Sequence, residues 1–111
     1  MTTGIQTIIY PVKDLAKAKA VYGALLGAAP VVDSPYYVGY NVAGQDIGLD
    51  PNGHNEGMTA YWHVADIEAS IAALVAAGAA VSEPAKNVGG GRLIASMKDA
   101  DGNLIGLLQN P

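Results

Sequence analysis

The stretch TAYWHVADIEAS, residues 59–70, has the pattern of a strand, an aspartate and the start of a helix. Its first residues include the aromatic and β-branched types that strands favour. Asp66 suits a helix N-cap, because its carboxylate accepts hydrogen bonds from the free N–H groups of the first turn. The stretch TIIYPVKDLAKA, residues 7–18, repeats the pattern, with Asp14 in the place of Asp66. The chain therefore contains two copies of one strand-to-helix unit.

Each copy leads into a predicted helix. Apolar side chains recur at helical spacing from residue 15 to 26 and again from residue 67 onward,. Gly27 and Gly78 are the predicted stops. The apolar stripes comprise Leu15, Ala18, Tyr22, Leu25 and Leu26 in the first copy, and Ile67, Ile71, Leu74 and Val75 in the second. Trp62 is predicted to lie in the core under the second helix.

Three short strand-like runs follow each helix. The dipeptides Ala43-Gly44 and Asp101-Gly102 predict tight hairpins between the last two runs of each copy,. A turn-rich linker, residues 51–58, includes His54, which is expected to be exposed. We therefore predict an α+β fold in one domain of 111 residues. Two tandem βαβββ modules, residues 1–52 and 57–111, would form a curved eight-stranded mixed sheet with the helices on its outer face.

A glycine interrupts the last predicted strand of each copy. GQDIGL, residues 44–49, contains Gly48, and GNLIGL, residues 102–107, contains Gly106 at the matching position. Glycine weakens a strand interior and usually marks a bulge or a close approach by another group. The repeated glycine predicts a shared structural reason in both copies.

Composition excludes several classes of partner. The formal net charge is −4, without a basic run, so neither nucleic acid nor an anionic membrane surface is an expected partner,. There is no cysteine, which removes thiolate metal sites and cysteine nucleophiles,. The beginning of the chain has no pattern of a signal peptide, and no apolar run is long enough to span a bilayer. The expectation is a cytoplasmic protein.

The repeat resembles the vicinal oxygen chelate superfamily, which comprises glyoxalase I, bleomycin-resistance proteins and extradiol dioxygenases. The matching stretches are IIYPVKDLAKAKAVYGALLG in the first half, and WHVADIEASIAALVAAGA and GGGRLIASMKDADGNLIGLLQNP in the second. The resemblance implies paired modules around a concave pocket, and a homodimer. Enzymes of the family hold a divalent metal with four side chains, and the resemblance places those positions at Thr7, Gly48, Thr59 and Gly106. Such residues supply no imidazole or carboxylate, so we predict neither a metal site nor a cofactor.

Strand parity predicts which other side chains share the pocket face. Ile9, Tyr61 and His63 alternate with residues that face the helices, Asp46 shares a face with Gly48, and Leu104 shares one with Gly106. Arg92 follows a glycine-rich loop and could pair with an anionic ligand group or lie on the surface. The predicted ligand-binding residues are Thr7, Ile9, Asp46, Gly48, Thr59, Tyr61, His63, Arg92, Leu104 and Gly106. Of the clustered tyrosines, Tyr36 and Tyr40 share one face and Tyr37 takes the other, and parity does not decide which face lines the pocket.

Two functions agree with this pattern. The first is a metal-free protein that sequesters a small molecule, such as an aromatic compound, in the sheet cup, where glycine leaves room for a flat ligand. The second is an enzyme, either a glyoxalase-like lyase or isomerase or a metal-independent catalyst that uses His63 and Tyr61. His63 could act as a general acid or base because its ordinary pKa is near neutrality, but no partner for it is visible in the sequence. We therefore favour the binding protein and assign no catalytic residue.

Overall fold

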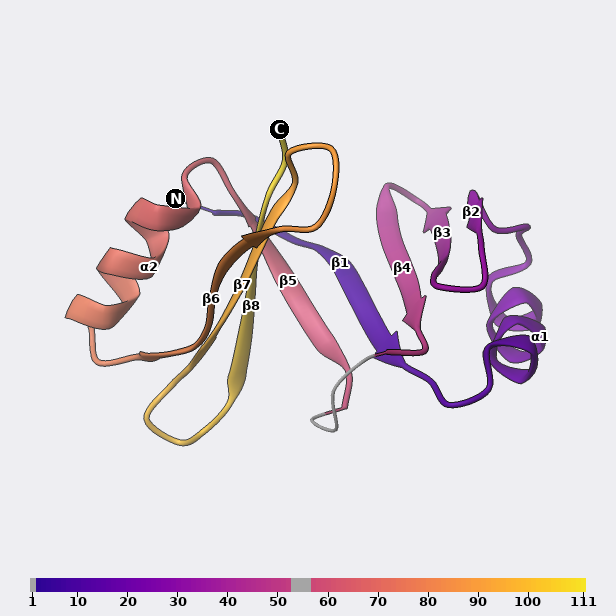
Figure 1. Ribbon diagram of the computed structural model, residues 1–111, viewed down its shortest axis with the longest axis horizontal. Coiled ribbons are helices and arrows are strands. Elements are labelled where there is room, and N and C mark those ends of the chain that lie inside the picture. The colour runs from indigo at the N-terminus through magenta and orange to yellow at the C-terminus, as the bar shows by residue number, and fades with distance from the viewer. Residues whose placement is uncertain (1, 53–56) are drawn as a thin grey trace. The chain divides into compact units, whose positions relative to one another are not determined.

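A computed structural model describes residues 2–52 and 57–111, so His54 of the linker lies outside the described residues (Figure 1). The described elements are, in order, β1 (Thr2–Pro11), α1 (Leu15–Leu26), β2 (Val32–Asp33), β3 (Val38–Val42), β4 (Gln45–Asp50), β5 (Thr59–Val64), α2 (Ile67–Ala76), β6 (Ala80–Asn87), β7 (Leu93–Lys98) and β8 (Leu104–Gln109). Each half therefore has the predicted βαβββ order, and the fold is α+β with strands of mixed direction.

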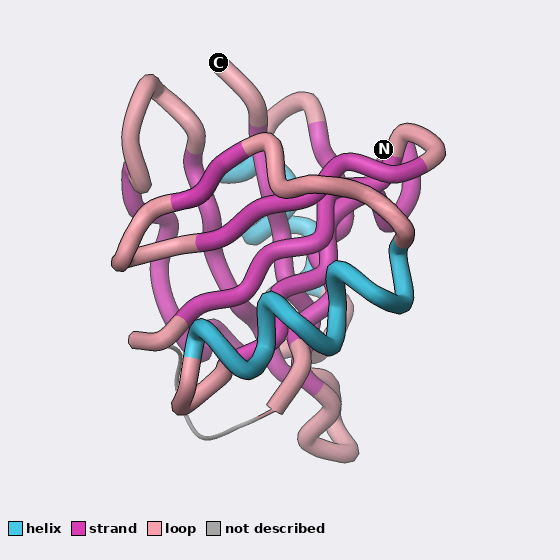
Figure 2. The backbone as a smooth tube through the Cα atoms, turned by 90° about the vertical axis from the view of Figure 1, so that its right-hand side faces the viewer, coloured by secondary structure: helices cyan, strands magenta, loops and turns pink. Residues whose placement is uncertain are grey.

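The chain forms two compact units, and we call them the first and second modules. The first module is Gln6–Thr59, and the second is Ala60–Pro111 together with the residues of β1 up to Ile5. In the first module the strand order is β2-β3-β4-β1, with β1 parallel to β4 and the other pairs antiparallel. Helix α1 packs against β3 and β4, and Figure 2 shows it lying along the strands of this module.

The second module repeats this topology. The order is β5-β8-β7-β6, and the first residues of β1 lie beside β5. Strand β5 runs parallel to β8, whereas the β6–β7 and β7–β8 pairs are antiparallel. Helix α2 packs on β6, β7 and β8.

Both helices begin at the predicted residues; α1 ends at its predicted glycine, and α2 ends at Ala76, two residues before its predicted glycine. The Asp14 carboxylate accepts from the Lys17 backbone N–H at 3.1 Å, and the Asp66 carboxylate accepts from the Ala69 N–H at the same distance. Gly27 ends α1 in the left-handed conformation, at φ 63°, which a residue without Cβ adopts without strain. Gly78 follows α2 at φ 109°.

Two predicted members of the apolar stripes are exposed. Leu25 is 74% exposed and Val75 is 49% exposed, so neither belongs to the core. The other stripe residues pack toward the strands: Leu15, Ala18, Tyr22 and Leu26 in the first module, and Ile67, Ile71 and Leu74 in the second. Each module thus has its own small core, which includes Leu49 and Tyr40 in the first and Leu107 and Met97 in the second.

The two hairpins differ, although the sequence predicts a tight turn in both. Val42 pairs with Gln45 across Ala43-Gly44, and both turn residues have positive φ, at 53° and 78°. This is the backbone of a two-residue hairpin. In the second module Lys98 pairs with Leu104, so the five residues 99–103 form the connection. The prediction of a tight turn at Asp101-Gly102 was wrong, because Asp99 organises a longer loop around its carboxylate.

Neither described helix is long and apolar enough to cross a bilayer.

Candidate functional site

One face of the first module gathers four of the predicted site residues. Strands β1 and β4 place Thr7 opposite Asp46 and Ile9 opposite Gly48. Thr7 is 2% exposed, whereas the Asp46 carboxylate accepts a hydrogen bond at 2.8 Å from the Asn41 side-chain amide. These residues alternate with Tyr10 and Ile47, which pack in the core with α1. The parity prediction is therefore correct for this pair of strands.

Gly48 is a glycine because other side chains occupy the space that its side chain would need. A Cβ on Gly48 would meet the phenolic oxygen of Tyr37, and would lie 2.6 Å from the Ile9 Cδ1 atom. Both neighbours are far ends of side chains rather than backbone. The space that the glycine was expected to leave for a flat ligand is filled at this position by a tyrosine of the chain.

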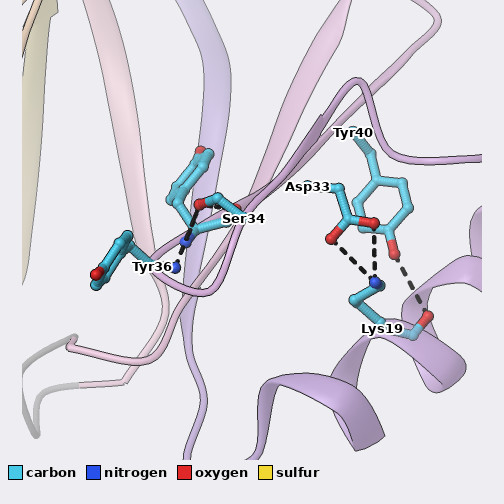
Figure 3. A network of polar contacts seen from close by, with 6 residues as sticks. Lys19, Asp33, Ser34, Tyr36 and Tyr40 are labelled. Carbon is cyan, nitrogen blue, oxygen red and sulfur yellow. Dashed lines mark hydrogen bonds and ion pairs between the residues drawn. The ribbon is translucent and has the colours of Figure 1, made fainter.

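Tyr37 follows a small turn that the Ser34 side chain organises, and Figure 3 shows Ser34 and Tyr36 of this turn. The Ser34 Oγ accepts from the backbone N–H groups of Tyr36 and Tyr37 at 3.2 and 3.1 Å, and it donates to the Tyr37 carbonyl. Tyr40 lies apart from this turn, since its ring is buried and its hydroxyl donates to the Lys19 carbonyl of α1 at 3.3 Å. Tyr36 is 74% exposed. The three clustered tyrosines therefore have three different environments, and Tyr37 lies over Gly48.

The second module has a comparable face. Tyr61 on β5 pairs with Gly106 on β8, which in turn pairs with Ser96 on β7. His63 pairs with Leu108 on the same face and is 7% exposed. A Cβ on Gly106 would lie 2.7 Å from both the Ala60 carbonyl oxygen and the Tyr61 Cδ1 atom. The Tyr61 ring therefore covers Gly106, much as Tyr37 covers Gly48.

The remaining predicted residues lie at or just before the first residues of strands. Thr59 begins β5, is 4% exposed and belongs to the first module. Leu104 begins β8 opposite Lys98. The Arg92 Nε donates to the Asn110 side-chain oxygen at 3.2 Å, just before β7 begins. Arg92 thus has a partner within the chain, and its contact with a ligand stays a prediction.

The residues at the family's four metal positions do not fit a metal. Threonine offers only a neutral hydroxyl and glycine offers no side-chain donor, whereas zinc and similar ions need imidazole, thiolate or carboxylate ligands. Within residues 2–52 and 57–111, no three side chains of histidine, aspartate or glutamate gather as metal ligands would. No chemical step through a metal can be derived from these four positions.

A pocket that the sequence pattern does not predict lies on the opposite, helix-facing side of the second module. Trp62 is 38% exposed rather than buried under α2, so its predicted core position was wrong. It lines a pocket of about 620 Å³ together with residues of β5, β8, α2 and Thr2 of β1. We call this the α2 pocket, and its lining comprises Thr2, Trp62, Val64, Ala65, Asp66, Ala69, Ser70, Ala73, Leu74, Ile105 and Leu107. The signal in the sequence was the run of small residues on α2 opposite a tryptophan.

Comparison with known proteins establishes the family. The model of the Glyoxalase/Bleomycin resistance protein/Dioxygenase superfamily matches residues 4–107. The chain therefore belongs to this superfamily, as its repeat had indicated. No curated protein sequence matches the chain.

Several solved structures share the fold at low sequence identity. Methylmalonyl-CoA epimerase from Mycobacterium tuberculosis is 21% identical, with a TM-score of 0.78 over 99% of this chain and 89% of that one. A superfamily member from Vibrio splendidus is 18% identical, with a TM-score of 0.69 over 94% and 97%. A structure described as NAD-dependent benzaldehyde dehydrogenase from Legionella pneumophila is also 18% identical, with a TM-score of 0.74 over 95% and 98%. At these identities the similarity shows the fold alone.

Proposed function

We propose that this chain is a metal-free small-molecule-binding protein of the glyoxalase and bleomycin-resistance superfamily. The observation that carries the proposal is that a tyrosine ring covers the glycine at each of the two strand positions where the family's enzymes carry a metal-binding carboxylate. An aromatic wall in place of a charged ligand suits contact with an organic molecule rather than with an ion.

The chemistry of the proposed ligand follows from these two faces. Tyr37 and Tyr61 each offer a broad apolar ring with a polar tip, so an aromatic ligand would gain stacking contacts beside them. Asp46 lies two residues before Gly48 on β4, and His63 pairs with Leu108, two residues after Gly106 on β8. Asp46 and His63 would orient polar substituents of the ligand.

Ligand-detected NMR with 2-naphthol as an uncharged aromatic probe tests the binding face. Tyr37→Leu should weaken the saturable binding of the probe, because it removes the ring over Gly48. Tyr36→Leu is the matched control, since this neighbouring tyrosine is already exposed to solvent. Equal affinity in the two variants would contradict the assignment of Tyr37 to the binding face.

Metal analysis separates the binding protein from an enzyme of the same superfamily. We expect only substoichiometric zinc, nickel, manganese or iron after dialysis of the purified chain. A stoichiometric ion that survives dialysis would overturn the proposal, as would turnover of methylmalonyl-CoA, the compound named for the epimerase neighbours. In that outcome His63→Gln should abolish turnover, whereas a binding protein should retain much of its affinity after this change.

A further inference from the structure

We propose that the α2 pocket is a second binding site, which takes an uncharged apolar molecule that carries a ring. It lies on the helix side of the second module, whereas Tyr61, His63 and Gly106 lie on the other face of the same strands. The inference therefore does not depend on the function proposed above, and either can fail without the other.

The pocket exists because α2 presents small side chains to a large one. Ala69, Ser70 and Ala73 line it from the helix, and Trp62 lines it from the strand β5. When the two repeats are aligned in sequence on their helix caps, Asp14 and Asp66, Trp62 corresponds to Tyr10 and Leu74 corresponds to Tyr22. In the first module the rings of Tyr10 and Tyr22 lie 4.7 Å apart between centroids, so two aromatic side chains occupy the corresponding positions. In the second module the shorter Leu74 leaves the pocket open.

The size and the lining of the pocket indicate the class of ligand. A volume of about 620 Å³ lies within the roughly 300–1,000 Å³ typical of small-molecule sites. Leu107 and Ile105 of β8, Val64 of β5 and Leu74 provide an apolar interior, and the Trp62 indole provides a flat wall. A ring compound would gain both apolar burial and stacking against the indole.

The pocket has few polar side chains, and these already make hydrogen bonds within the chain. The Thr2 hydroxyl donates to the His63 carbonyl at 2.7 Å, and the Ser70 hydroxyl donates to the Asp66 carbonyl at 2.9 Å. The Asp66 carboxylate caps α2 and is the one charged side chain in the lining. A negative group at the rim of a chain with net charge −4 disfavours an anionic ligand by like-charge repulsion.

Trp62 makes the test direct, since it is the single tryptophan of the chain and lines the pocket. The probe is N-phenyl-1-naphthylamine, an uncharged fluorophore that accepts energy from tryptophan. We expect a saturable titration with quenching of Trp62 and sensitised probe emission. The absence of saturable binding, in a chain that circular dichroism shows to be folded, would overturn the proposal.

A matched pair of variants locates the probe. Ala73→Leu places a larger side chain into the pocket and should weaken probe binding about tenfold, the factor that corresponds to about 1.4 kcal/mol. Ala72→Leu makes the same change on the same helix, at an exposed position outside the lining, and should leave binding unchanged. Ala69→Leu fills the pocket from a second position if Ala73→Leu does not fold. Equal binding in filled and control variants would overturn the proposal.

Two further comparisons test the ligand class and the alternative occupant. The anionic analogue 1-anilinonaphthalene-8-sulfonate should bind more weakly than the uncharged probe. Asp66→Asn keeps a capping side chain and removes the negative charge, so it should reduce the difference in affinity between the two probes. Equal affinity of the two probes in the unaltered chain would contradict the uncharged class. Probe binding that falls as self-association rises with protein concentration would show that a second copy covers the pocket, which would also overturn the proposal.

Discussion

The two modules share one order of elements and one pair of aspartate caps, but they fill the space beneath their helices differently. In the first module, Tyr22 of α1 lies against Tyr10, and Tyr40 is buried with its hydroxyl on the α1 backbone. In the second module, Trp62 faces alanines and a serine, and a pocket remains. Repetition of a backbone pattern therefore does not repeat the packing, because packing depends on the volumes of the side chains that face one another.

On the face of each module that points away from its helix, the local packing is repeated although the sequence position of the tyrosine is not. There the same device occurs twice, since Gly48 and Gly106 each make room for a tyrosine. The tyrosine comes from different places, however. Tyr37 precedes β3, whereas Tyr61 belongs to β5, the strand that pairs with Gly106. Tyrosines at two positions that do not correspond in the repeat therefore cover the two corresponding glycines.

The largest expected effect comes from removing the matched aromatic residues on the helix side. Tyr10→Ala should destabilise the chain by about 2–4 kcal/mol, because it deletes a half-buried ring that packs against Tyr22. Trp62→Ala removes a larger side chain but should cost only about 1–2 kcal/mol, since much of the indole already faces solvent or an open pocket. Chemical denaturation measures both free energies of unfolding. A larger loss of unfolding free energy for Trp62→Ala than for Tyr10→Ala would mean that side chains pack around Trp62 as tightly as they pack around Tyr10.

The next effect distinguishes the two glycines. Gly106→Ala would place a Cβ against the Ala60 carbonyl oxygen, which is backbone and cannot turn aside, so we expect a loss of about 2–3 kcal/mol. Gly48→Ala meets only the ends of the Tyr37 and Ile9 side chains, which can move, and should cost about 1 kcal/mol. Denaturation curves of the two variants give the comparison. The reverse order would show that Tyr37 is fixed more firmly than the β5 backbone.

The hairpin of the first module offers a stabilising change. Ala43 has φ 53°, which is strained for a residue with a Cβ and no polar group, whereas asparagine is favoured at this position of a two-residue turn. Ala43→Asn should therefore raise the free energy of unfolding by about 0.5–1 kcal/mol. The midpoint of thermal unfolding measures the gain. Ala100→Asn, in the loop of the second module, is the control and should give no comparable increase.

Local sequence signals predicted the fold, because caps, turns and strand parity depend on neighbouring residues. Asp14, Asp66 and Gly27 have the roles that their types and positions indicated, and the family match agrees with the repeat. The glycine pair marks a close approach, which is one of the two meanings that the sequence left open,.

What approaches those glycines was not predictable from spacing. Tyr37 reaches Gly48 only because Ser34 shapes the preceding turn and the strands bring both together. The open space beside Trp62 likewise depends on how much volume α2 fills, which periodicity does not report. Leu25 and Val75 follow the apolar spacing and are still exposed. Helical spacing determines which face of the helix a side chain lies on, but not whether another part of the chain packs against that side chain.

The smallest expected effect concerns the loop that replaces a tight hairpin in the second module. Hydrogen bonds from the side chain and backbone of Asn103, with smaller contributions from the backbone of Asp101 and Gly102, lower the pKa of the Asp99 carboxyl below its ordinary value. A lowered pKa in the folded chain means a contribution to stability that is present above the ordinary aspartate pKa and is lost as the pH falls through the folded value. Asn103→Ala removes the side-chain donor, which is the largest cause, so the pKa of Asp99 should rise toward its ordinary value.

An NMR titration of the Asp99 carboxyl carbon checks this expectation. Asn41→Ala is the matched control, because Asn41 donates in the same way to Asp46 in the first module and does not touch the loop of the second. The control should leave the Asp99 titration where it is. If Asn103→Ala also leaves it unchanged, the backbone donors alone hold the carboxylate. The longer loop would then depend on the turn around Asp99 rather than on the asparagine that distinguishes it from the Ala43-Gly44 hairpin.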